Sequence, residues 1–324
     1  MTTAPISLAD VQRARERLAP YLSPTPLRHY PTLDAALPGV TLLVKHENVQ
    51  PTGSFKVRNG LSTLTALSAA ERQAGVVGAT TGNHGLGLAF AGRELGIPVT
   101  ICVPRGNNPE KIAALRAWGA TVIEDGADYD EAVAVAQRLV EQNGFTLAHS
   151  TNNVHVLAGA GTMTLEILEQ CNDLDVLLIA VGGGSQAVGA ITVSGVMQPG
   201  LRIIGVQAAG ASAQHDGWHA KAPAKTTSAS TFAEGVATRS TYDLTFPTLV
   251  DGLADFVTVT DAETAEAVRL ILSATHHLVE GAGAMGVAAA LKLRQQLKGE
   301  KVGVVFCGGN MDSAVLRRIL SCEM

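Results

Sequence analysis

One lysine, Lys56, lies in a setting that suits amine chemistry. It follows the small, turn-forming residues of Pro51-Thr52-Gly53-Ser54-Phe55 and precedes a helical stretch. Burial at such a loop-to-helix junction lowers the pKa of a lysine, so its amine is free to form a Schiff base with a carbonyl compound. A lysine after a turn is more often a solvated surface residue. Lys56 therefore becomes a candidate only together with other features.

The second feature is a glycine loop, Gly182-Gly183-Gly184-Ser185, between an apolar strand and a helix. Backbone N–H groups at such a turn can bind a phosphate without basic side chains. A simple tight turn and a dinucleotide-binding loop are the alternatives. The spacing is not GxGxxG, and no acidic residue ends the strand expected at 201–206, so a monophosphate is the better match.

A third polar turn is Thr80-Thr81-Gly82-Asn83-His84-Gly85. Its hydroxyl groups, its amide and its backbone N–H groups are suited to bind a substrate carboxylate. Thr and Asn are also ordinary helix N-cap residues, which is the structural alternative. The presence of all three features in one chain predicts a common site.

Alternating strands and helices must position these three turns. Strands are expected at 41–45, from Val76, and at 99–103, 121–124, 176–181, 201–206 and 301–307. Helices are expected at 8–18, at 111–118, 129–142, 260–278 and 282–297, in stretches that end at Ala70 and Leu95, after residue 189 and after Asn310. Loops are expected at 47–60, 80–87 and 182–189, and loops with short helices at 208–240. The alternation predicts an α/β protein with parallel sheets and right-handed crossovers.

Composition limits the classes of partner. The 324 residues suffice for two domains, 46% are hydrophobic and 16% are charged, and the net charge is -5. No run of Lys or Arg could follow a nucleic acid or an anionic membrane, and no apolar stretch approaches the roughly 20 residues of a membrane helix. The N-terminus lacks the pattern of a signal peptide, so we expect a cytoplasmic protein. The four cysteines are far apart in the sequence and form no CxxC pair, which indicates neither zinc nor disulfides.

Nearly the whole chain resembles the fold-type II pyridoxal 5'-phosphate (PLP) enzymes, and within them the threonine/serine dehydratases and the similar serine racemases. Residues 47–58 are similar to the cofactor-lysine signature of this family, with Lys56 at the Schiff-base position. The resemblance implies PLP as cofactor and two three-layer αβα domains with mostly parallel sheets, as in the tryptophan synthase β-like fold. It implies a large PLP-binding domain, 1–47 and 149–324, and an inserted small domain, 48–148, that carries Lys56 and the Asn83 loop.

The same resemblance assigns roles to individual residues. Asn83 matches the residue that hydrogen-bonds the phenolic oxygen of PLP, and Cys307 stands where the family has a serine beside the pyridine nitrogen. The implied cofactor-binding residues are Phe55, Lys56, Asn83, Gly182, Gly183, Gly184, Ser185, Gly235, Glu280 and Cys307. The implied substrate-binding residues are Ser54, Thr80, Thr81, Gly82 and His84.

Departures from the family pattern are expected to affect substrate specificity more than cofactor binding. The thiol of Cys307 is a weaker donor than a hydroxyl, and Ser185 replaces a fourth glycine. Residues 149–152 read His-Ser-Thr-Asn where the family has a motif similar to His-Pro-Phe-Asp, which leaves the substrate open. Residues 207–213 lack the Glu and Asp that hold a divalent cation in one branch, so no metal is expected. Thr81 replaces the serine that acts on the second face in racemases.

The resemblance implies dehydration of L-threonine, L-serine or a 3-substituted serine to a 2-oxo acid and ammonia, with Lys56 as the catalytic residue that removes the α-proton. A racemase, a β-replacement synthase and a PLP-binding protein without turnover are the alternatives. A small amino acid is the expected substrate, and a homodimer is the expected assembly. Because the chain ends at Met324, no regulatory domain is expected.

Overall fold

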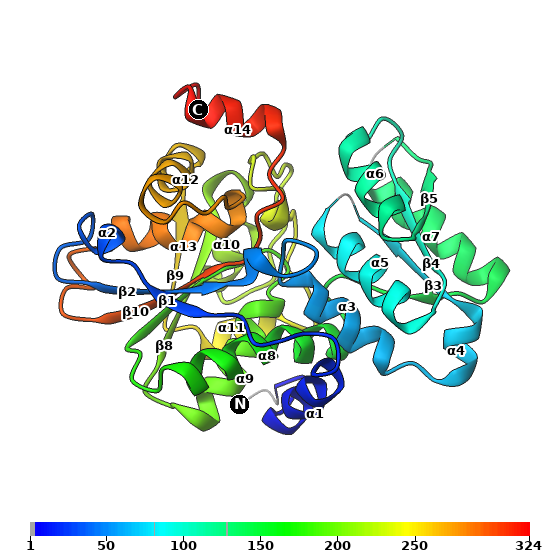
Figure 1. The fold of residues 1–324 in the computed structure, drawn as a ribbon, viewed down its shortest axis with the longest axis horizontal. Coiled ribbons are helices and arrows are strands. Elements are labelled where there is room, and N and C mark those ends of the chain that lie inside the picture. Colours follow the sequence, from blue (N-terminus) through cyan, green and yellow to red (C-terminus); the bar gives the residue numbers. More distant parts are fainter. Residues whose placement is uncertain (1–3, 81, 128) are drawn as a thin grey trace.

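Two β-sheets organise the chain in the computed structural model, which describes residues 4–80, 82–127 and 129–324 (Figure 1). The larger sheet has the order β1-β2-β10-β7-β8-β9. Its strands are β1 (Leu27–His29), β2 (Thr41–His46), β10 (Lys301–Phe306), β7 (Val176–Ala180), β8 (Arg202–Ala208) and β9 (Asp255–Val259). All neighbours are parallel except β1 and β2, which are antiparallel.

The smaller sheet is entirely parallel and has the order β5-β4-β3-β6. Its strands are β3 (Val76–Ala79), β4 (Val99–Val103), β5 (Thr121–Glu124) and β6 (Thr146–Leu147). Successive side chains of a strand point to opposite faces. Ile101 therefore packs with α3 (Lys56–Thr65), α5 (Asn83–Leu95) and α6 (Pro109–Ala117), whereas Cys102 packs with α7 (Tyr129–Asn143).

Helices also cover both faces of the larger sheet. On one face α13 (Gly281–Lys292) packs on β7 to β10, and α12 (Asp261–Thr275) packs on α13. On the other face α9 (Ser185–Met197) packs on β7 and β8, and α8 (Val154–Gln170) packs on α9 (Figure 1). Each sheet is thus the middle of three layers, which confirms the predicted fold class.

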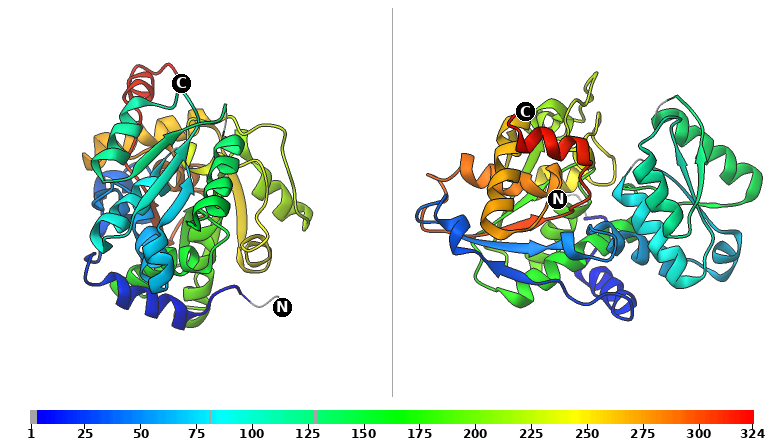
Figure 2. Two further views of the ribbon diagram at one scale, coloured as in Figure 1. Left: turned by 90° about the vertical axis from the view of Figure 1, so that its right-hand side faces the viewer. Right: turned by 45° about the horizontal axis from the view of Figure 1, so that its top comes forward.

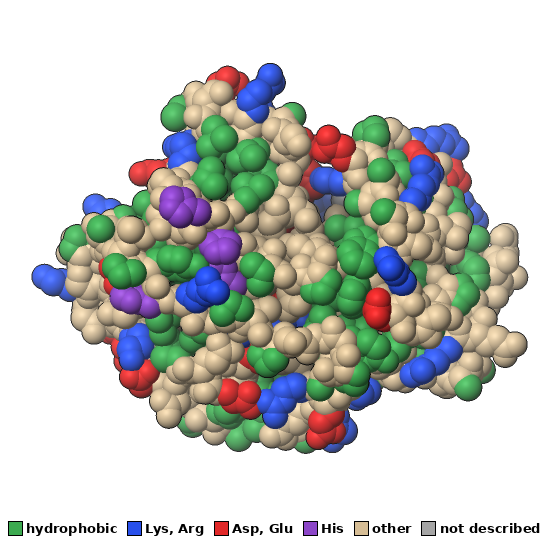
Figure 3. Space-filling model, in the orientation of Figure 1, with side chains coloured by type: hydrophobic (Ala, Val, Ile, Leu, Met, Phe, Trp, Pro, Cys, Tyr) green, Lys and Arg blue, Asp and Glu red, His purple; other side chains and the backbone are tan. Residues whose placement is uncertain are grey.

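The remaining elements are short or peripheral. They are α1 (Leu8–Leu18), α2 (Pro31–Asp34), α4 (Ala69–Ala74), α10 (Ala213–Ala220), α11 (Phe246–Gly252), α14 (Ser313–Leu320) and the 3-10 helices η1 (Glu47–Val49), η2 (Ala209–Ala211) and η3 (Glu234–Val236). In the described part of the chain, no helix is long and apolar enough to cross a bilayer. Charges of both signs are interspersed on the face shown in Figure 3.

Several predicted boundaries were wrong. The expected loops at 47–60, 80–87 and 182–189 extend too far, because α3, α5 and α9 already begin at Lys56, Asn83 and Ser185. The helix α8 was not predicted at all. Most of its residues are buried, so it has no polar face and no amphipathic period. Strands β1, β6 and β9 and helix α11 were also missed.

The helix that begins at Lys56 packs directly on its neighbours through glycines. A Cβ atom at Gly87 of α5 would lie 2.3 Å from the carbonyl oxygen of Lys56. A Cβ atom at Gly159 of α8 would lie 2.6 Å from the carbonyl oxygen of Arg58. The backbone of α3 is therefore in contact with α5 and α8, and Figure 2 shows it where the part built on the smaller sheet joins the rest.

We expect Gly87→Ala to destabilise the protein by about 1–3 kcal/mol, because the added methyl group would push α5 off the Lys56 backbone. Gly195→Ala in α9 is the matched control, since a Cβ atom added there would meet no neighbouring atom within 4 Å. Alanine favours a helix over glycine by roughly 0.5–1 kcal/mol. Urea unfolding of both variants checks this. Equal midpoints for the two would contradict the close contact.

Candidate active site

A cavity of about 860 Å³ lies where β3, β7 and β10 end, at the carboxyl edges of both sheets. Ligands in open α/β sheets bind at such edges. The cavity is lined by all but two of the predicted site residues: Phe55, Lys56, Thr80, Gly82, Asn83, His84, Gly182, Gly183, Gly184, Ser185, Gly235, Glu280 and Cys307. Ser54 is fully buried beside them, and its hydroxyl has no hydrogen-bond partner among the described residues. Thr81 lies outside the described residues.

Backbone pairing with the end of β10 holds Lys56 in place. The N–H of Phe55 donates to the carbonyl oxygen of Cys307 at 3.0 Å. The N–H of Gly309 donates to the carbonyl oxygen of Gly53 at 2.9 Å, and Ser54 forms a bridge with Gly308. Segments that are far apart in the sequence, residues 53–55 and 307–309, thus pair beside the lysine. The core strand β10 therefore holds Lys56 in position.

Burial dominates the electrostatics of Lys56. Protein surrounds the side chain, although it keeps some accessible area because it lines the cavity. Burial lowers its pKa to about 8, and the nearby Cys307 and Glu280 oppose that shift only in part. Its Nζ atom lies 4.8 Å from the centre of the Phe55 ring. Roughly a tenth of the amine is therefore uncharged at pH 7, far more than for an ordinary lysine.

The lowered pKa predicts a pH dependence of amine reactivity. In the cofactor-free protein, only the neutral amine of Lys56 attacks an aldehyde, so uptake of PLP should accelerate about tenfold per pH unit below pH 8 and level off above it. An ordinary lysine, with a pKa near 10.4, would continue to accelerate up to about pH 10. Stopped-flow absorbance between pH 6.5 and 10 distinguishes the two, with Lys56→Ala as the blank.

Burial favours the neutral forms of the two acidic groups that act on the pKa of Lys56. Burial raises the pKa of Glu280 to about 7 and raises the pKa of the Cys307 thiol well above its usual range. Cys307 therefore stays a thiol at neutral pH. Glu280 changes its charge near neutrality, and the neighbouring Asn83 is its hydrogen-bond donor.

A chain of side-chain amides orients Asn83. Asn310 Nδ2 donates to Asn83 Oδ1 at 2.7 Å and to the carbonyl oxygen of Thr52 at 2.8 Å. Asn83 Nδ2 donates to Glu280 Oε1 at 2.7 Å. Since only one side of the Asn83 amide can accept, these contacts fix which side carries the hydrogens. Asn310 was not among the predicted site residues, although it follows the predicted residue Cys307 closely in the sequence.

Four helices begin at the cavity without a side-chain cap: α3, α5, α9 and α13. Elsewhere, α1, α4 and α12 have Ser7, Ser68 and Thr260 as capping side chains. The first N–H groups of an α-helix have no partner within the helix, and they carry partial positive charge. In α3 the N–H groups of Val57 and Arg58 already donate to the carbonyl oxygens of Ser54 and Phe55. The other uncapped helices therefore have N–H donors that could bind anions in the cavity.

The turn between β7 and α9 tolerates only glycine. A Cβ atom at Gly183 would lie 2.1 Å from Thr151 Oγ1, and one at Gly182 would lie 2.8 Å from the carbonyl oxygen of Gly235. Gly184 has φ +97°, which L-residues rarely adopt. The absence of side chains leaves the backbone N–H groups of the loop accessible to a ligand.

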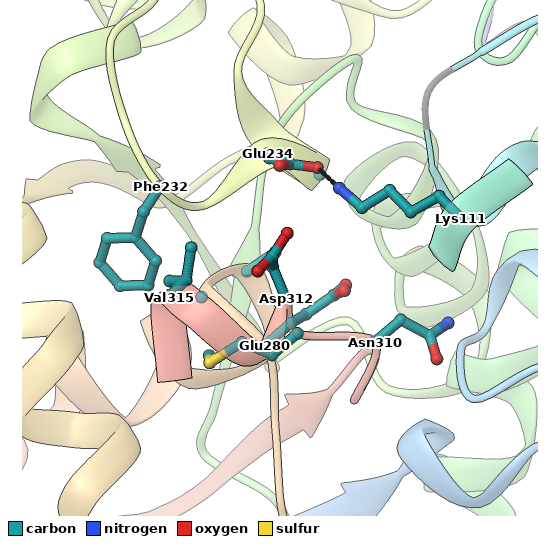
Figure 4. Close-up of a pocket in the computed structure, with 11 residues that line it drawn as sticks. Lys111, Phe232, Glu234, Glu280, Asn310, Asp312 and Val315 are labelled. Carbon is teal, nitrogen blue, oxygen red and sulfur yellow. Dashed lines mark hydrogen bonds and ion pairs between the residues drawn. The ribbon is translucent and has the colours of Figure 1, made fainter. Parts of the chain in front are cut away.

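Polar contacts cross the rim of the cavity. Lys111 of α6 forms an ion pair with Glu234, and Asn108 Nδ2 donates to Asp312 Oδ2 at 2.5 Å. Figure 4 shows Lys111 reaching Glu234, with Glu280, Asn310 and Asp312 facing them across a smaller pocket. Among the residues that the structure describes, no three His, Cys, Asp or Glu side chains are grouped so that they could hold a metal ion.

Residues 18–308 match the model of a protein family described as pyridoxal-phosphate dependent enzyme. The chain belongs to this family. PLP is therefore its cofactor. The match includes every predicted site residue from Ser54 to Cys307.

Relatives of this PLP-dependent enzyme cover nearly the whole chain. An L-threonine ammonia-lyase of Thermotoga maritima is 36% identical over 98% of this chain and 78% of the relative. An L-threo-3-hydroxyaspartate ammonia-lyase of a Pseudomonas species is 35% identical over 94% of this chain and 96% of the relative. Among solved structures, maize serine racemase has a TM-score of 0.93 and 29% identity, and the alignment covers 98% of both chains.

The cavity of this PLP-dependent enzyme fits its cofactor. Lys56 would supply a buried amine for the aldehyde, and the glycine loop with the N-terminus of α9 would supply N–H donors for the phosphate. In the part of the chain that the structure describes, the buried carbonyl oxygen of the Gln186 side chain has no hydrogen-bond partner, so it could accept a hydrogen bond from a ligand. The structure thus brings an amine, a glycine loop and uncapped helix N-termini to one cavity.

Proposed function

We propose that the chain is a PLP-dependent ammonia-lyase that converts a small β-hydroxy amino acid into a 2-oxo acid and ammonia. L-Threonine, L-serine or a 3-substituted serine is the substrate. The observation that carries the proposal is the buried amine of Lys56, placed between the glycine loop and the uncapped N-terminus of α5. The relatives named as ammonia-lyases for threonine and 3-hydroxyaspartate support the reaction class.

The residues would hold the cofactor as follows. Lys56 would bind it covalently through Nζ, and residues 182–185 would bind its phosphate through their N–H groups. Asn83, oriented by Glu280 and Asn310, would hydrogen-bond its phenolic oxygen. The neutral thiol of Cys307 would lie at the pyridine nitrogen, with Phe55 and Gly235 near the ring. When bound, PLP would supply an electron sink for the negative charge that develops at the substrate Cα atom.

The remaining steps belong to the protein. The N-terminus of α5, with Thr80, Gly82 and His84, would bind the substrate carboxylate, and Ser54 would contribute its unpartnered hydroxyl. Thr81, outside the described residues, belongs to the same predicted turn. Lys56, whose lowered pKa leaves part of its amine uncharged near neutral pH, would take the α-proton and return it to the β-hydroxyl group, which would leave as water. Hydrolysis of the released enamine by water would give the 2-oxo acid and ammonia. Burial lowers the pKa of His84 to about 3, so this residue stays neutral and acts by hydrogen bonding.

Release of 2-oxo acid and ammonia tests the proposal. Purified protein is incubated with L- and D-threonine, L- and D-serine and L-threo-3-hydroxyaspartate, and its PLP absorbance is recorded. Turnover of one of these supports an ammonia-lyase and identifies the substrate. Bound PLP without keto acid from any member of the panel would contradict the proposal.

A racemase is the second candidate, because the maize enzyme of nearly the same fold carries that name. It would invert the Cα atom and release no keto acid, so chiral chromatography of the same incubations separates the two activities. A β-replacement synthase would require an added nucleophile such as sulfide. Thr81, at the position of the second-face serine, favours the lyase over the racemase.

Domain organisation, assembly and location form part of this proposal. A small domain of residues 48–148 would carry Lys56 and Asn83, and residues 1–47 and 149–324 would form the PLP-binding domain. The location of β3 to β6 within 76–147 supports this division. We further propose that the protein is a homodimer and that it is cytoplasmic. The free cysteines agree with the cytoplasmic location, because thiols stay reduced there. Sedimentation of the holoenzyme tests the dimer.

A further inference from the structure

The glycine loop also has an outer side, which faces away from the cavity. Thr245 Oγ1 donates to the carbonyl oxygen of Gly183 at 2.7 Å. Gln214 Nε2 lies at 3.4 Å from the carbonyl oxygens of both Gly182 and Gly183. Thr245 and Gln214 are fully buried. The carbonyl groups of the loop are therefore held from behind by two side chains that sequence reasoning did not single out.

Holding a carbonyl group also orients the next N–H group. The peptide unit is planar and trans, so the C=O of one residue and the N–H of the next point in opposite directions. With the carbonyl of Gly183 tied to Thr245, the N–H of Gly184 points away from Thr245. Both glycines line the cavity. Among the hydrogen bonds of the described residues, none uses the N–H of Gly184.

The hydroxyl of Thr245 is not used in the way usual for its position. Thr245 is the N-cap residue of α11, where a threonine hydroxyl commonly accepts from an N–H of its own helix. No such bond is present in α11. The carbonyl oxygen of Tyr242 is 3.5 Å from Oγ1, much farther than that of Gly183. The single O–H donor of Thr245 thus serves the glycine loop.

We infer that Thr245 is a positioning residue of the phosphate-binding loop, which keeps the Gly183 carbonyl turned outward so that the Gly184 N–H faces the phosphate group of the cofactor. The inference rests on the proposed function, which places the phosphate at residues 182–185. Thr245 touches neither the cofactor nor the substrate in this scheme, and it acts only through the backbone of the loop.

Thr245→Val tests the inference, because valine has nearly the same shape and no donor. We expect the variant to bind PLP about 10- to 100-fold more weakly, since the buried Gly183 carbonyl loses its close partner. Pyridoxal, which has no phosphate, should bind the variant within about twofold of the original protein. The ratio of the two dissociation constants is the readout, and general damage to the fold would not change it.

Two further variants complete the experiment. Thr245→Ser keeps the hydroxyl and should restore most of the preference for PLP over pyridoxal. Thr264→Val is the matched control, because Thr264 is equally buried and donates only to the carbonyl oxygen of Thr260 within α12. If valine prevents folding, Thr245→Ala allows the same comparison.

An unchanged ratio in Thr245→Val would overturn the inference, and so would an equal weakening of PLP and pyridoxal. Failure of the proposed function has a different signature. In that case the original protein itself would show no PLP absorbance band that depends on Lys56.

Discussion

Lys56→Ala is expected to lower the release of keto acid and ammonia by about 10³-fold or more. The change removes both the covalent attachment of the cofactor and the group that takes the α-proton, and general-base catalysis alone is commonly worth roughly 10²- to 10⁴-fold. The PLP absorbance band of the holoenzyme should disappear as well. A coupled assay for keto acid, run beside the absorbance spectrum, measures both effects.

The same variant should not lose stability without cofactor. Because burial lowers the pKa of Lys56 to about 8, the lysine is mostly charged at pH 7, and the burial of this charge opposes folding. This cost is fully present below pH 8 and is lost progressively as the pH rises from about 8 to the unfolded-state pKa near 10.4. We therefore expect an unfolding midpoint at pH 7 no lower than that of the original protein. Alanine lines the existing cavity, so no new closed void is created.

A surface lysine provides the control for this experiment. Lys301 forms an ion pair with the exposed Asp173 outside the cavity, and Lys301→Ala should retain activity within about twofold. Lys56→Arg keeps the charge but cannot replace the amine, so it should be as inactive as Lys56→Ala. Substantial turnover by either Lys56 variant would contradict the assignment of this lysine.

The second large effect is expected at a buried group of four charges, the buried quartet. It consists of Lys45 of β2, Glu47 of η1, Arg58 of α3 and Glu166 of α8, and all four are almost fully buried. Arg58 donates to Glu47 at 2.8 Å from both Nε and Nη2, and to Glu166 at 2.6 and 2.8 Å. Lys45 Nζ lies 2.7 Å from Glu166 Oε2. The quartet is electrically neutral as a whole.

We expect Glu166→Gln to destabilise the protein by about 3–5 kcal/mol, because removal of one partner leaves an excess positive charge in the interior. Lys45→Met should have a similar cost. The double variant restores neutrality, so its cost should be smaller than the sum of the two single costs. Chemical denaturation of the original protein and the three variants measures the free energies of unfolding for this double-mutant cycle.

The matched control lies on the same helix. Glu169, one turn after Glu166 in α8, is exposed and forms an ion pair with Arg15 of α1. Glu169→Gln should cost less than about 1 kcal/mol, as is usual for exposed pairs. A similar loss at both glutamates, or strictly additive costs in the double variant, would show that burial of the quartet does not set its energetics.

The quartet also bears on the site, because Arg58 follows Lys56 by two residues. Its guanidinium joins the first turn of α3 to Glu47 of η1 and to Glu166 of α8. From the sequence, Arg58 was recognised only as part of the family-like segment 47–58, and no partner for its charge was predicted. Its carboxylate partner Glu166 lies 108 residues away, in a helix that periodicity did not reveal.

Elements with strong local signals were predicted well. The bounds of α1, β4 and β5 are those expected from the sequence. A capping box of Ser7 and Asp10 starts α1, and short apolar runs between turn residues specify the two strands. Short strands such as β6, with two residues, carry too few positions for a pattern. The domain boundaries and the roles of the individual site residues stay predictions.

The sequence by itself determined the fold class, the family resemblance and the turns that meet at the cavity, because glycines, helix starts and apolar runs act over a few residues. Tertiary structure alone decided the contacts that tune this site, such as Asn83 with Glu280, 197 residues apart, and Thr245 with Gly183. It also set the pKa of Lys56 near 8. A periodic pattern specifies which face of an element is buried but not what lies against it, and those distant neighbours produce desolvation and orientation.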